Sequence, residues 1–89
     1  MPTIAFTHHL QRHAPAHTVA VDANSVAAAL NLVFAAYPAL RGYVMDEHSH
    51  LRRHVAVFVN GAMLRRGDVL SNPIPPDAEI YVMQALSGG

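Results

Sequence analysis

The 89-residue chain ends in QALSGG, residues 84–89, with two glycines at the terminal carboxylate. No charged or capping residue closes this end, which directly follows an alternating apolar run. Because glycine makes up about 7% of average composition, two terminal glycines arise by chance in roughly one chain in 200. Glycine has no Cβ, so such an end can approach another protein's backbone closely. The rest of the chain must show whether this carboxylate has a function.

The seven histidines are a second candidate for chemistry, because imidazole is a common metal ligand. His9 and His13 have the i, i+4 spacing that shares a helix face, and His48 and His50 would point the same way on a strand. A zinc site needs three or four converging ligands whose orientations are fixed by further contacts. Since the histidines fall in two separate polar turns, we expect exposed loop histidines and no metal site.

Other residue types give no pattern typical of an active site. The chain has no cysteine, and it shows no glycine-rich phosphate loop and no Ser/His/Asp motif. The carboxylate pairs Asp46/Glu47 and Asp77/Glu79 lie in turns, where solvated charges are the simplest interpretation. We therefore expect a protein that is not an enzyme on its own and binds no cofactor.

The composition is that of one small folded domain. Hydrophobic residues make up 52% and charged residues 13%, which argues against disorder. No apolar stretch approaches the ~18 residues of a transmembrane helix, and residues 1–13 lack the pattern of a secretory signal. The formal charge is zero, with six arginines and no lysine, which gives little support to nucleic-acid binding. We expect a cytoplasmic protein with neither a nucleic acid nor a membrane as partner.

The N-terminal half predicts two strands and a helix. Residues 3–7 and 17–21 alternate like strands of a hairpin with a long polar turn between them. Residues 25–37 have helical spacing, and we expect Asn24 rather than Ser25 to cap the helix and Pro38 to end or distort it. The apolar residues of that spacing are Val26, Leu30, Val33, Phe34 and Tyr37.

The C-terminal half predicts three strands. We expect a turn of helix and then a polar hairpin around residues 46–50. Residues 54–61 form the clearest strand. Asn60-Gly61 at its end is a tight-turn signal before a short return strand at 62–65. Residues 79–86 form the last strand. The order β-β-α-β-β-β predicts an α+β fold, a mixed sheet with one main helix packed across one face. We place the domain at residues 1–84 and a flexible tail at 85–89.

The last strand also predicts what each face of the sheet carries. If Ile80 and Val82 face the helix together with the valines of 54–61, then Phe58, Tyr81 and Met83 face outward. An open sheet face is normally polar, so an outward apolar cluster indicates a docking surface. A one-residue slip in register would exchange the two faces.

This order of elements resembles the β-grasp, ubiquitin-like sulfur carriers of the MoaD/ThiS family. The resemblance covers the whole chain, and its specific part is residues 54–89, with FVNG at the end of a strand, a Pro/Asp turn before the last strand, and the Gly-Gly end. The His-rich loop and residues 46–53 are more similar to the longer carriers that supply cysteine or thio-metabolite pathways than to the molybdopterin and thiamine branches.

The resemblance implies a function for the terminal glycines. A ubiquitin-activating-type adenylating enzyme that uses ATP would join AMP to the Gly89 carboxylate, and sulfur would displace AMP to leave a thiocarboxylate. Ser87 and Gly88 would belong to the tail that enters the partner's active site. A sulfur-acceptor biosynthetic enzyme of cysteine, thio-metabolite, molybdopterin or thiamine type would then take the sulfur.

The resemblance also implies that the outward residues bind the activating enzyme. These residues are Phe58, Tyr81, Met83 and Leu86, with Arg65 or Arg53 at the rim. Two alternatives stay open. One is a ubiquitin-like modifier whose Gly89 is joined to lysines of other proteins, and the other is a plain interaction domain with an inert Gly-Gly end.

Overall fold

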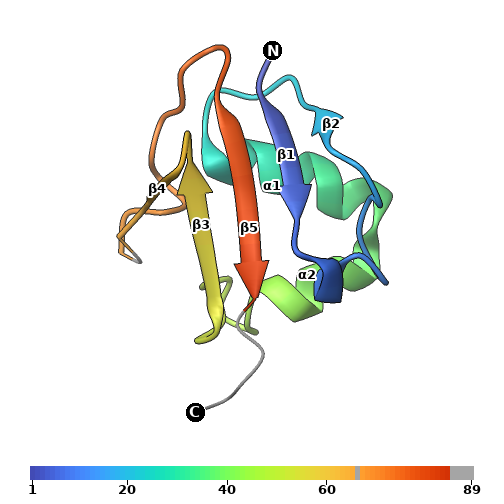
Figure 1. The fold of residues 1–89 in the computed structure, drawn as a ribbon. Helices are drawn as coiled ribbons and strands as arrows, with labels where there is room; N and C mark the ends of the chain where they lie inside the picture. The colour runs from blue at the N-terminus through green and yellow to red at the C-terminus, as the bar shows by residue number, and fades with distance from the viewer. Residues whose placement is uncertain (66, 85–89) are drawn as a thin grey trace.

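The predicted order of elements is confirmed in a computed structural model that describes residues 1–65 and 67–84 (Figure 1). The strands are β1 Thr3–Phe6, β2 Val19–Ala20, β3 Val55–Val59, β4 Ala62–Met63 and β5 Glu79–Gln84, and the helices are α1 Val26–Ala36 and α2 Pro38–Val44. The expected turn of helix after α1 is thus a seven-residue helix. The predicted tail, residues 85–89, lies outside the described residues.

The sheet has the strand order β2-β1-β5-β3-β4, so β5 is its central strand. β5 runs parallel to β1, with Ile4 beside Ile80, and antiparallel to β3, with Val57 beside Val82. Both helices lie behind one face of this mixed sheet, and no helix formed by the described residues covers the opposite face (Figure 1). Within the described ranges, neither helix has the length and apolar character that crossing a membrane requires.

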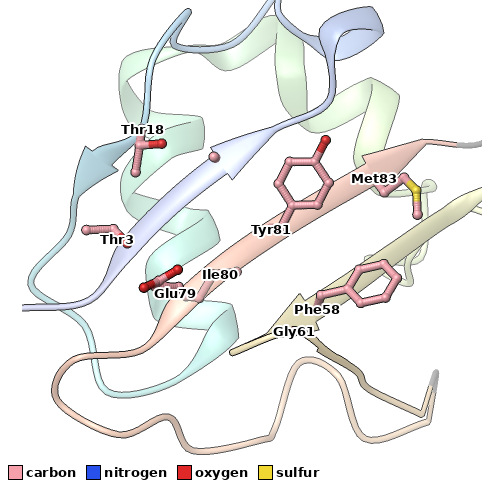
Figure 2. Close-up of a pocket in the computed structure, with 9 residues that line it drawn as sticks. Thr3, Thr18, Phe58, Gly61, Glu79, Ile80, Tyr81 and Met83 are labelled. Atoms are coloured by element: carbon pink, nitrogen blue, oxygen red, sulfur yellow. The ribbon is translucent and has the colours of Figure 1, made fainter.

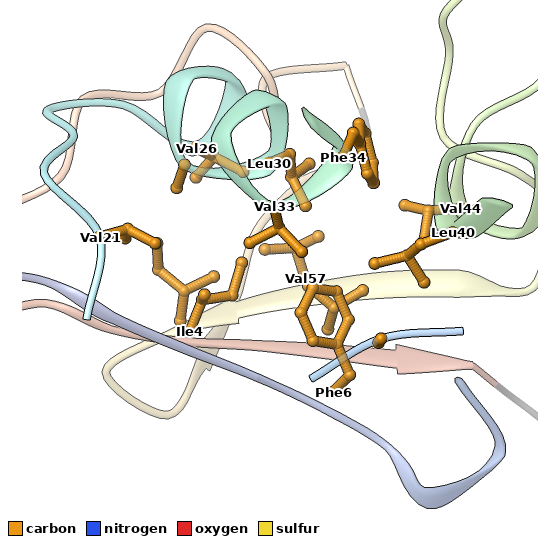
Figure 3. Packing of buried hydrophobic residues seen from close by; sticks show 14 of the residues in the cluster. Ile4, Phe6, Val21, Val26, Leu30, Val33, Phe34, Leu40, Val44 and Val57 are labelled. Carbon is orange, nitrogen blue, oxygen red and sulfur yellow. The ribbon is translucent and has the colours of Figure 1, made fainter. Parts of the chain in front are cut away.

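The covered face holds the core, as the alternation predicted (Figure 3). Leu30 and Val33 of α1 and Leu40 of α2 pack in one buried cluster with Ile4 and Val57 from the sheet. Ile80 and Val82 are also buried, which confirms the register inferred for the last strand. Tyr37 is the exception to the predicted helix face, since it is 39% exposed. The reason is Pro38, which begins α2 and leaves Tyr37 at the junction of the two helices.

Two connections contribute to the core more than their polar sequences indicate. The loop between β1 and β2 contains a 3₁₀ helix, His8–Leu10, and buries the side chain of Leu10 almost completely. The crossing between β4 and β5 buries Val69 and Ile74. Single apolar residues in a polar loop carry no periodicity, so the sequence did not reveal these contacts.

The N-cap of α1 is Ser25, so the preference for Asn24 was wrong. Ser25 has extended backbone angles, and its hydroxyl accepts the Ala28 N–H at 3.1 Å. The crossing supplies the neighbouring contacts: the carbonyl of Asn72 accepts the Val26 N–H, and the carbonyl of Asn24 accepts the Ile74 N–H at 3.0 Å. This tertiary arrangement fixes the residue at which the helix begins, because it satisfies N–H groups that the first turn leaves free.

The predicted tight turn joins β3 to β4. Asn60 and Gly61 both have positive φ, 51° and 84°, as a two-residue type I′ hairpin turn requires. The Asn60 side-chain oxygen accepts the Glu79 N–H at 2.9 Å, so the turn also fixes the start of β5.

Gly61→Ala should lower the free energy of unfolding by about 1–2 kcal/mol, because an L residue is strained at this positive φ. Gly42→Ala is the matched control, since Gly42 lies inside α2 and an added Cβ there meets no atom within 4 Å. Removing a helical glycine should raise the free energy of unfolding by about 0.5–1 kcal/mol. Urea unfolding of both variants tests the pair, and equal effects of the two substitutions would contradict the assigned turn.

Candidate functional site

The open face of the sheet carries an apolar concavity of about 630 Å³ (Figure 2). Phe58 of β3 and Tyr81 and Met83 of β5, here called the outer-face cluster, lie along it. The other lining residues are Thr3, Ala5, Thr18, Gly61, Glu79 and Ile80. The structure thus brings together the three outward residues predicted from the alternation of the last strand.

Strand register explains why these side chains meet. Phe58 stands directly opposite Tyr81 on β5 and opposite Met63 on β4, so one row of the outer face is apolar across three strands. Tyr81 is 41% exposed and Met63 65% exposed, whereas Phe58 and Met83 are half-buried. An open face meets water and is ordinarily polar, so this row indicates a surface that binds another protein. Sequence reasoning missed Met63, because the short return strand gave too few residues to assign a face.

The other residues predicted for partner binding do not line the concavity. Arg65 is exposed and lines a separate hollow beside Leu64 and Val69 at the β3–β4 edge of the sheet. Arg53 is exposed just before β3, beyond the pair formed by Val55 and Gln84. Leu86, Ser87, Gly88 and Gly89 lie outside the described residues.

The end of β5 is held by its neighbour β1. Because the two strands are parallel, the residues after β1 lie at the same end of the sheet as the residues after β5. The Thr7 N–H donates to the Val82 carbonyl at 3.0 Å, and the Gln84 N–H donates to the Thr7 hydroxyl at 3.2 Å. The N-terminus of the chain lies at the opposite end of the sheet (Figure 1). The path to residues 85–89 therefore begins at a fixed point beside Thr7.

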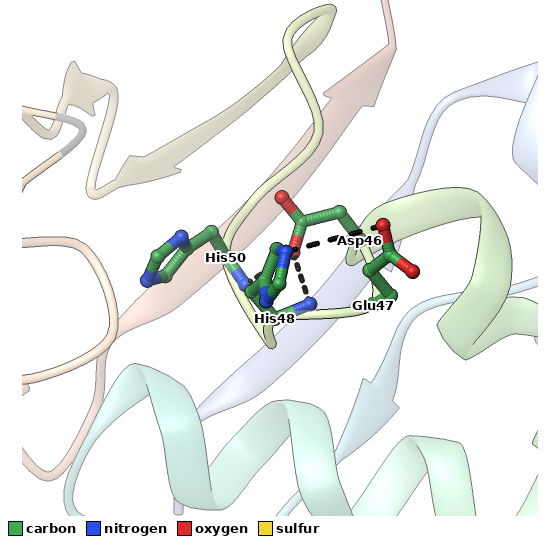
Figure 4. Close-up of polar contacts among 4 residues, drawn as sticks. All are labelled: Asp46, Glu47, His48 and His50. Atoms are coloured by element: carbon green, nitrogen blue, oxygen red, sulfur yellow. Dashed lines mark hydrogen bonds and ion pairs between the residues drawn. The ribbon is translucent and has the colours of Figure 1, made fainter.

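Five of the seven histidines make ring contacts, and these contacts lie in separate loops of the described structure. His13 stacks on Tyr43 with ring centroids 4.2 Å apart, which joins the β1–β2 loop to α2. The rings of His48 and His50 are 6.4 Å apart in the turn after α2 (Figure 4). No group of three or more His, Asp or Glu side chains with metal-binding geometry occurs in residues 1–65 and 67–84.

Asp46 organises the turn that carries His48 and His50 (Figure 4). One of its carboxylate oxygens accepts the N–H of His48 at 2.8 Å and of His50 at 2.9 Å. The His50 N–H is the main reason why the pKa of the Asp46 carboxyl is lowered, with the His48 N–H adding to the effect and partial desolvation opposing it. The carboxylate therefore has a local structural role.

The chain was compared with protein families and with curated proteins. The model of the ThiS family matches residues 6–89, which includes the two terminal glycines. Among curated proteins, none matches this chain.

Solved structures of similar shape are ubiquitin-like proteins of nearly the same length. SAMP1 from Haloferax volcanii is 25% identical, with a TM-score of 0.77 over 99% of this chain and 98% of that chain. A chain of the Amycolatopsis orientalis BexX/CysO complex is 19% identical, with a TM-score of 0.86 and complete coverage of both chains. CysO from Mycobacterium tuberculosis is 21% identical, with a TM-score of 0.82 over 97% of this chain and 100% of that chain. The expected ubiquitin-like β-grasp fold is confirmed.

The Asp46 carboxyl should titrate below its ordinary value of 3.8. Since the folded pKa is lowered, ionisation stabilises the fold above the unfolded pKa, and this stabilisation is lost as the pH falls through the folded pKa. Asp46→Asn keeps an oxygen acceptor but has no charge, so its stability relative to the wild type should improve only at acidic pH. A carboxyl ¹³C titration measures the pKa, and a value at or above 3.8 would contradict the assigned hydrogen bonds.

Proposed function

Because the chain belongs to the ThiS family, we propose that it is a sulfur carrier whose Gly89 carboxylate is adenylated by a partner and then converted to a thiocarboxylate. The observation that carries the proposal is the family match, which extends through the last strand to Gly89. The chain acts as a protein co-substrate and not as an enzyme, and it binds no cofactor of its own. ATP is used by the adenylating partner.

The chemistry needs only a carboxylate on the carrier. A carboxylate oxygen attacks the α-phosphorus of ATP, pyrophosphate leaves, and the acyl adenylate gains AMP as a good leaving group. Sulfide (HS⁻) then attacks the acyl carbon, a C–S bond forms as the C–O bond to AMP breaks, and a proton is released. The resulting thiocarboxylate donates its sulfur to an acceptor. The chain has no cysteine, and none is needed, because the sulfur is carried on the terminal carbonyl.

The outer-face cluster is the docking surface for the adenylating enzyme in this proposal. It supplies an apolar centre of the kind that protein interfaces bury, with the polar residues Thr18 and Glu79 also lining the concavity. The five residues after Gln84 can span at most about 18 Å if fully extended, at ~3.3–3.6 Å per residue. A partner held on the open face can therefore receive Gly89 in an active site near the end of β5.

The acceptor enzyme belongs to sulfur biosynthesis of the cysteine, thio-metabolite, molybdopterin or thiamine type. The crystallised complex of CysO with BexX supports binding of a second protein by a chain of this fold. The loop around Asp46–His50 favours the longer carriers of the cysteine and thio-metabolite type over the molybdopterin branch.

Protein modification is the second candidate function, favoured by the likeness to the archaeal modifier SAMP1 at 25% identity. In that function the activated Gly89 carbonyl is attacked by a lysine amine of another protein, and an isopeptide bond forms as AMP leaves. The 89 residues contain no lysine, so copies of the chain cannot be joined through lysine side chains. Peptide mapping for a Gly-Gly remnant on lysines of other proteins distinguishes this function from sulfur transfer.

Deleting Gly88 and Gly89 should abolish activation and leave the fold unchanged, because the described core ends before residue 85. The measurement is pyrophosphate release from ATP by the host's adenylating enzyme, with the thermal melting of both proteins as the control for folding. Equal pyrophosphate release with the truncated chain would contradict the proposed role of the terminal carboxylate. A truncated chain that no longer folds would contradict the assignment of residues 85–89 to a tail outside the core.

Phe58→Asp should weaken binding to the adenylating enzyme about tenfold or more, because it places a charge at the centre of the apolar interface. Its cost in folding should stay near 1–2 kcal/mol, since Phe58 is half-buried on an open face. The matched core variant is Phe34→Ala, for which we expect a loss of about 3–5 kcal/mol. Titration calorimetry and urea unfolding give the two readouts. Unchanged affinity for the Phe58 variant would exclude the outer face as the docking surface.

A further inference from the structure

The hydrogen-bond ladder between β1 and β5 changes at its last rung. The ladder begins where the Thr3 N–H donates to the Ala78 carbonyl at 2.9 Å, and it continues to the Thr7 N–H, which donates to the Val82 carbonyl. In a parallel ladder, a residue whose N–H donates to one carbonyl of the partner strand also accepts a hydrogen bond through its own carbonyl. The donor of that second bond is the N–H of the partner-strand residue two positions after the first acceptor. The regular acceptor for the Gln84 N–H is therefore the backbone carbonyl of Thr7.

That carbonyl instead accepts a hydrogen bond from the 3₁₀ helix. The chain turns into the 3₁₀ helix directly after Thr7, and the Thr7 carbonyl accepts the Leu10 N–H at 2.9 Å. The Thr7 hydroxyl takes the place of the carbonyl and accepts the Gln84 N–H at 3.2 Å. Thr7 is the N-cap residue of the 3₁₀ helix, yet its side chain makes no capping hydrogen bond there. A threonine at an N-cap ordinarily caps its own helix, so this hydroxyl is diverted to β5.

This exchange of a carbonyl acceptor for a hydroxyl acceptor matters because of the position of Gln84 in β5. Its N–H points toward β1, so the strand on the other side, where Val55 is its partner in register, cannot accept this hydrogen bond. The Thr7 hydroxyl therefore supplies the last rung to β1 at the final described residue before the segment that ends in Gly89.

We propose that Thr7 is a positioning residue that fixes Gln84, the last described residue of β5, and so sets the point to which residues 85–89 are attached. The inference rests on the proposed function, in which the carrier docks through its outer face and Gly89 must reach an active site at a set distance. Each residue released from the end of β5 adds about 3.3–3.6 Å to the reach of the chain beyond it and so increases the volume that Gly89 can sample. Thr7 acts on the reaction through Gln84 and contacts neither ATP nor the sulfur donor.

The first test needs no partner. Thr7→Val keeps the side-chain shape and removes the acceptor, and Thr7→Ser keeps the acceptor. In ¹⁵N-labelled protein, Thr7→Val should speed hydrogen exchange of the Gln84 amide about 3- to 10-fold, the range expected for one net hydrogen bond. Exchange at Ile80 should stay unchanged, and Thr7→Ser should restore the wild-type rate at Gln84. Wild-type exchange at Gln84 in Thr7→Val would overturn the inference.

The second test uses the host's adenylating enzyme, ATP and each carrier variant, with pyrophosphate release as the readout. Thr7→Val should keep the KM for the carrier within about twofold, because docking through the outer face is intact, and should lower kcat about 3- to 10-fold. Thr7→Ser should restore kcat. Thr7→Ala is the second variant without a hydroxyl and should change kcat as Thr7→Val does. Melting curves of all the variants are the control for folding.

The outcomes separate this inference from the function on which it rests. If the wild type is activated and both hydroxyl-free variants match its kcat, Thr7 has no positioning role. A rise in KM at unchanged kcat would also contradict the inference, since it would place the effect on docking. If the wild type itself is never adenylated, the proposed function fails and the positioning role fails with it, while the exchange experiment still reports whether the hydrogen bond exists.

Discussion

The pairing of β5 between β1 and β3 is the constraint on which the rest of this structure depends. It places β5, the last strand in sequence among the described residues, at the centre of the sheet, so the sheet cannot form without Glu79–Gln84. Two side chains extend this pairing beyond the regular ladder: the Asn60 oxygen accepts the Glu79 N–H at one end of β5, and the Thr7 hydroxyl accepts the Gln84 N–H at the other. The last described residue, Gln84, is therefore held in place by a hydrogen bond to Thr7.

The alternation of β5 also separates the core side of the sheet from its open face. Ile80 and Val82 lie under the helices, and Tyr81 and Met83 lie on the face that no helix covers. The same strand thus contributes one set of side chains to the core and the next set to the open face, which is the docking surface in the proposed function. Its end leads to the terminal glycines, so the docking surface and the proposed reactive carboxylate are joined by one short segment of backbone.

The sequence predicted those parts of the fold that depend on local pattern. The alternation of β3 and β5 identified both faces, and Asn60-Gly61 identified the hairpin, because positive φ at two successive positions demands such residues. Prediction from the sequence failed where tertiary contacts determine the structure. Ser25 caps α1 within a set of contacts from the distant 70–74 crossing, and Leu10 is buried in the core although it lies in a polar loop. The role of Thr7 was likewise invisible, since it depends on a hydroxyl reaching a strand 77 positions away in sequence.

The central claim is that sulfur is carried on Gly89, and intact-mass spectrometry tests it most directly. The protein would be purified from its host, or incubated with host extract, ATP and a sulfide source, and then weighed and fragmented. We expect a mass gain equal to the replacement of one oxygen by sulfur, located at Gly89 by fragmentation. An unchanged mass in an extract that demonstrably adenylates the chain would contradict it, and Gly89 found only in isopeptide bonds to other proteins would assign the protein to modification instead.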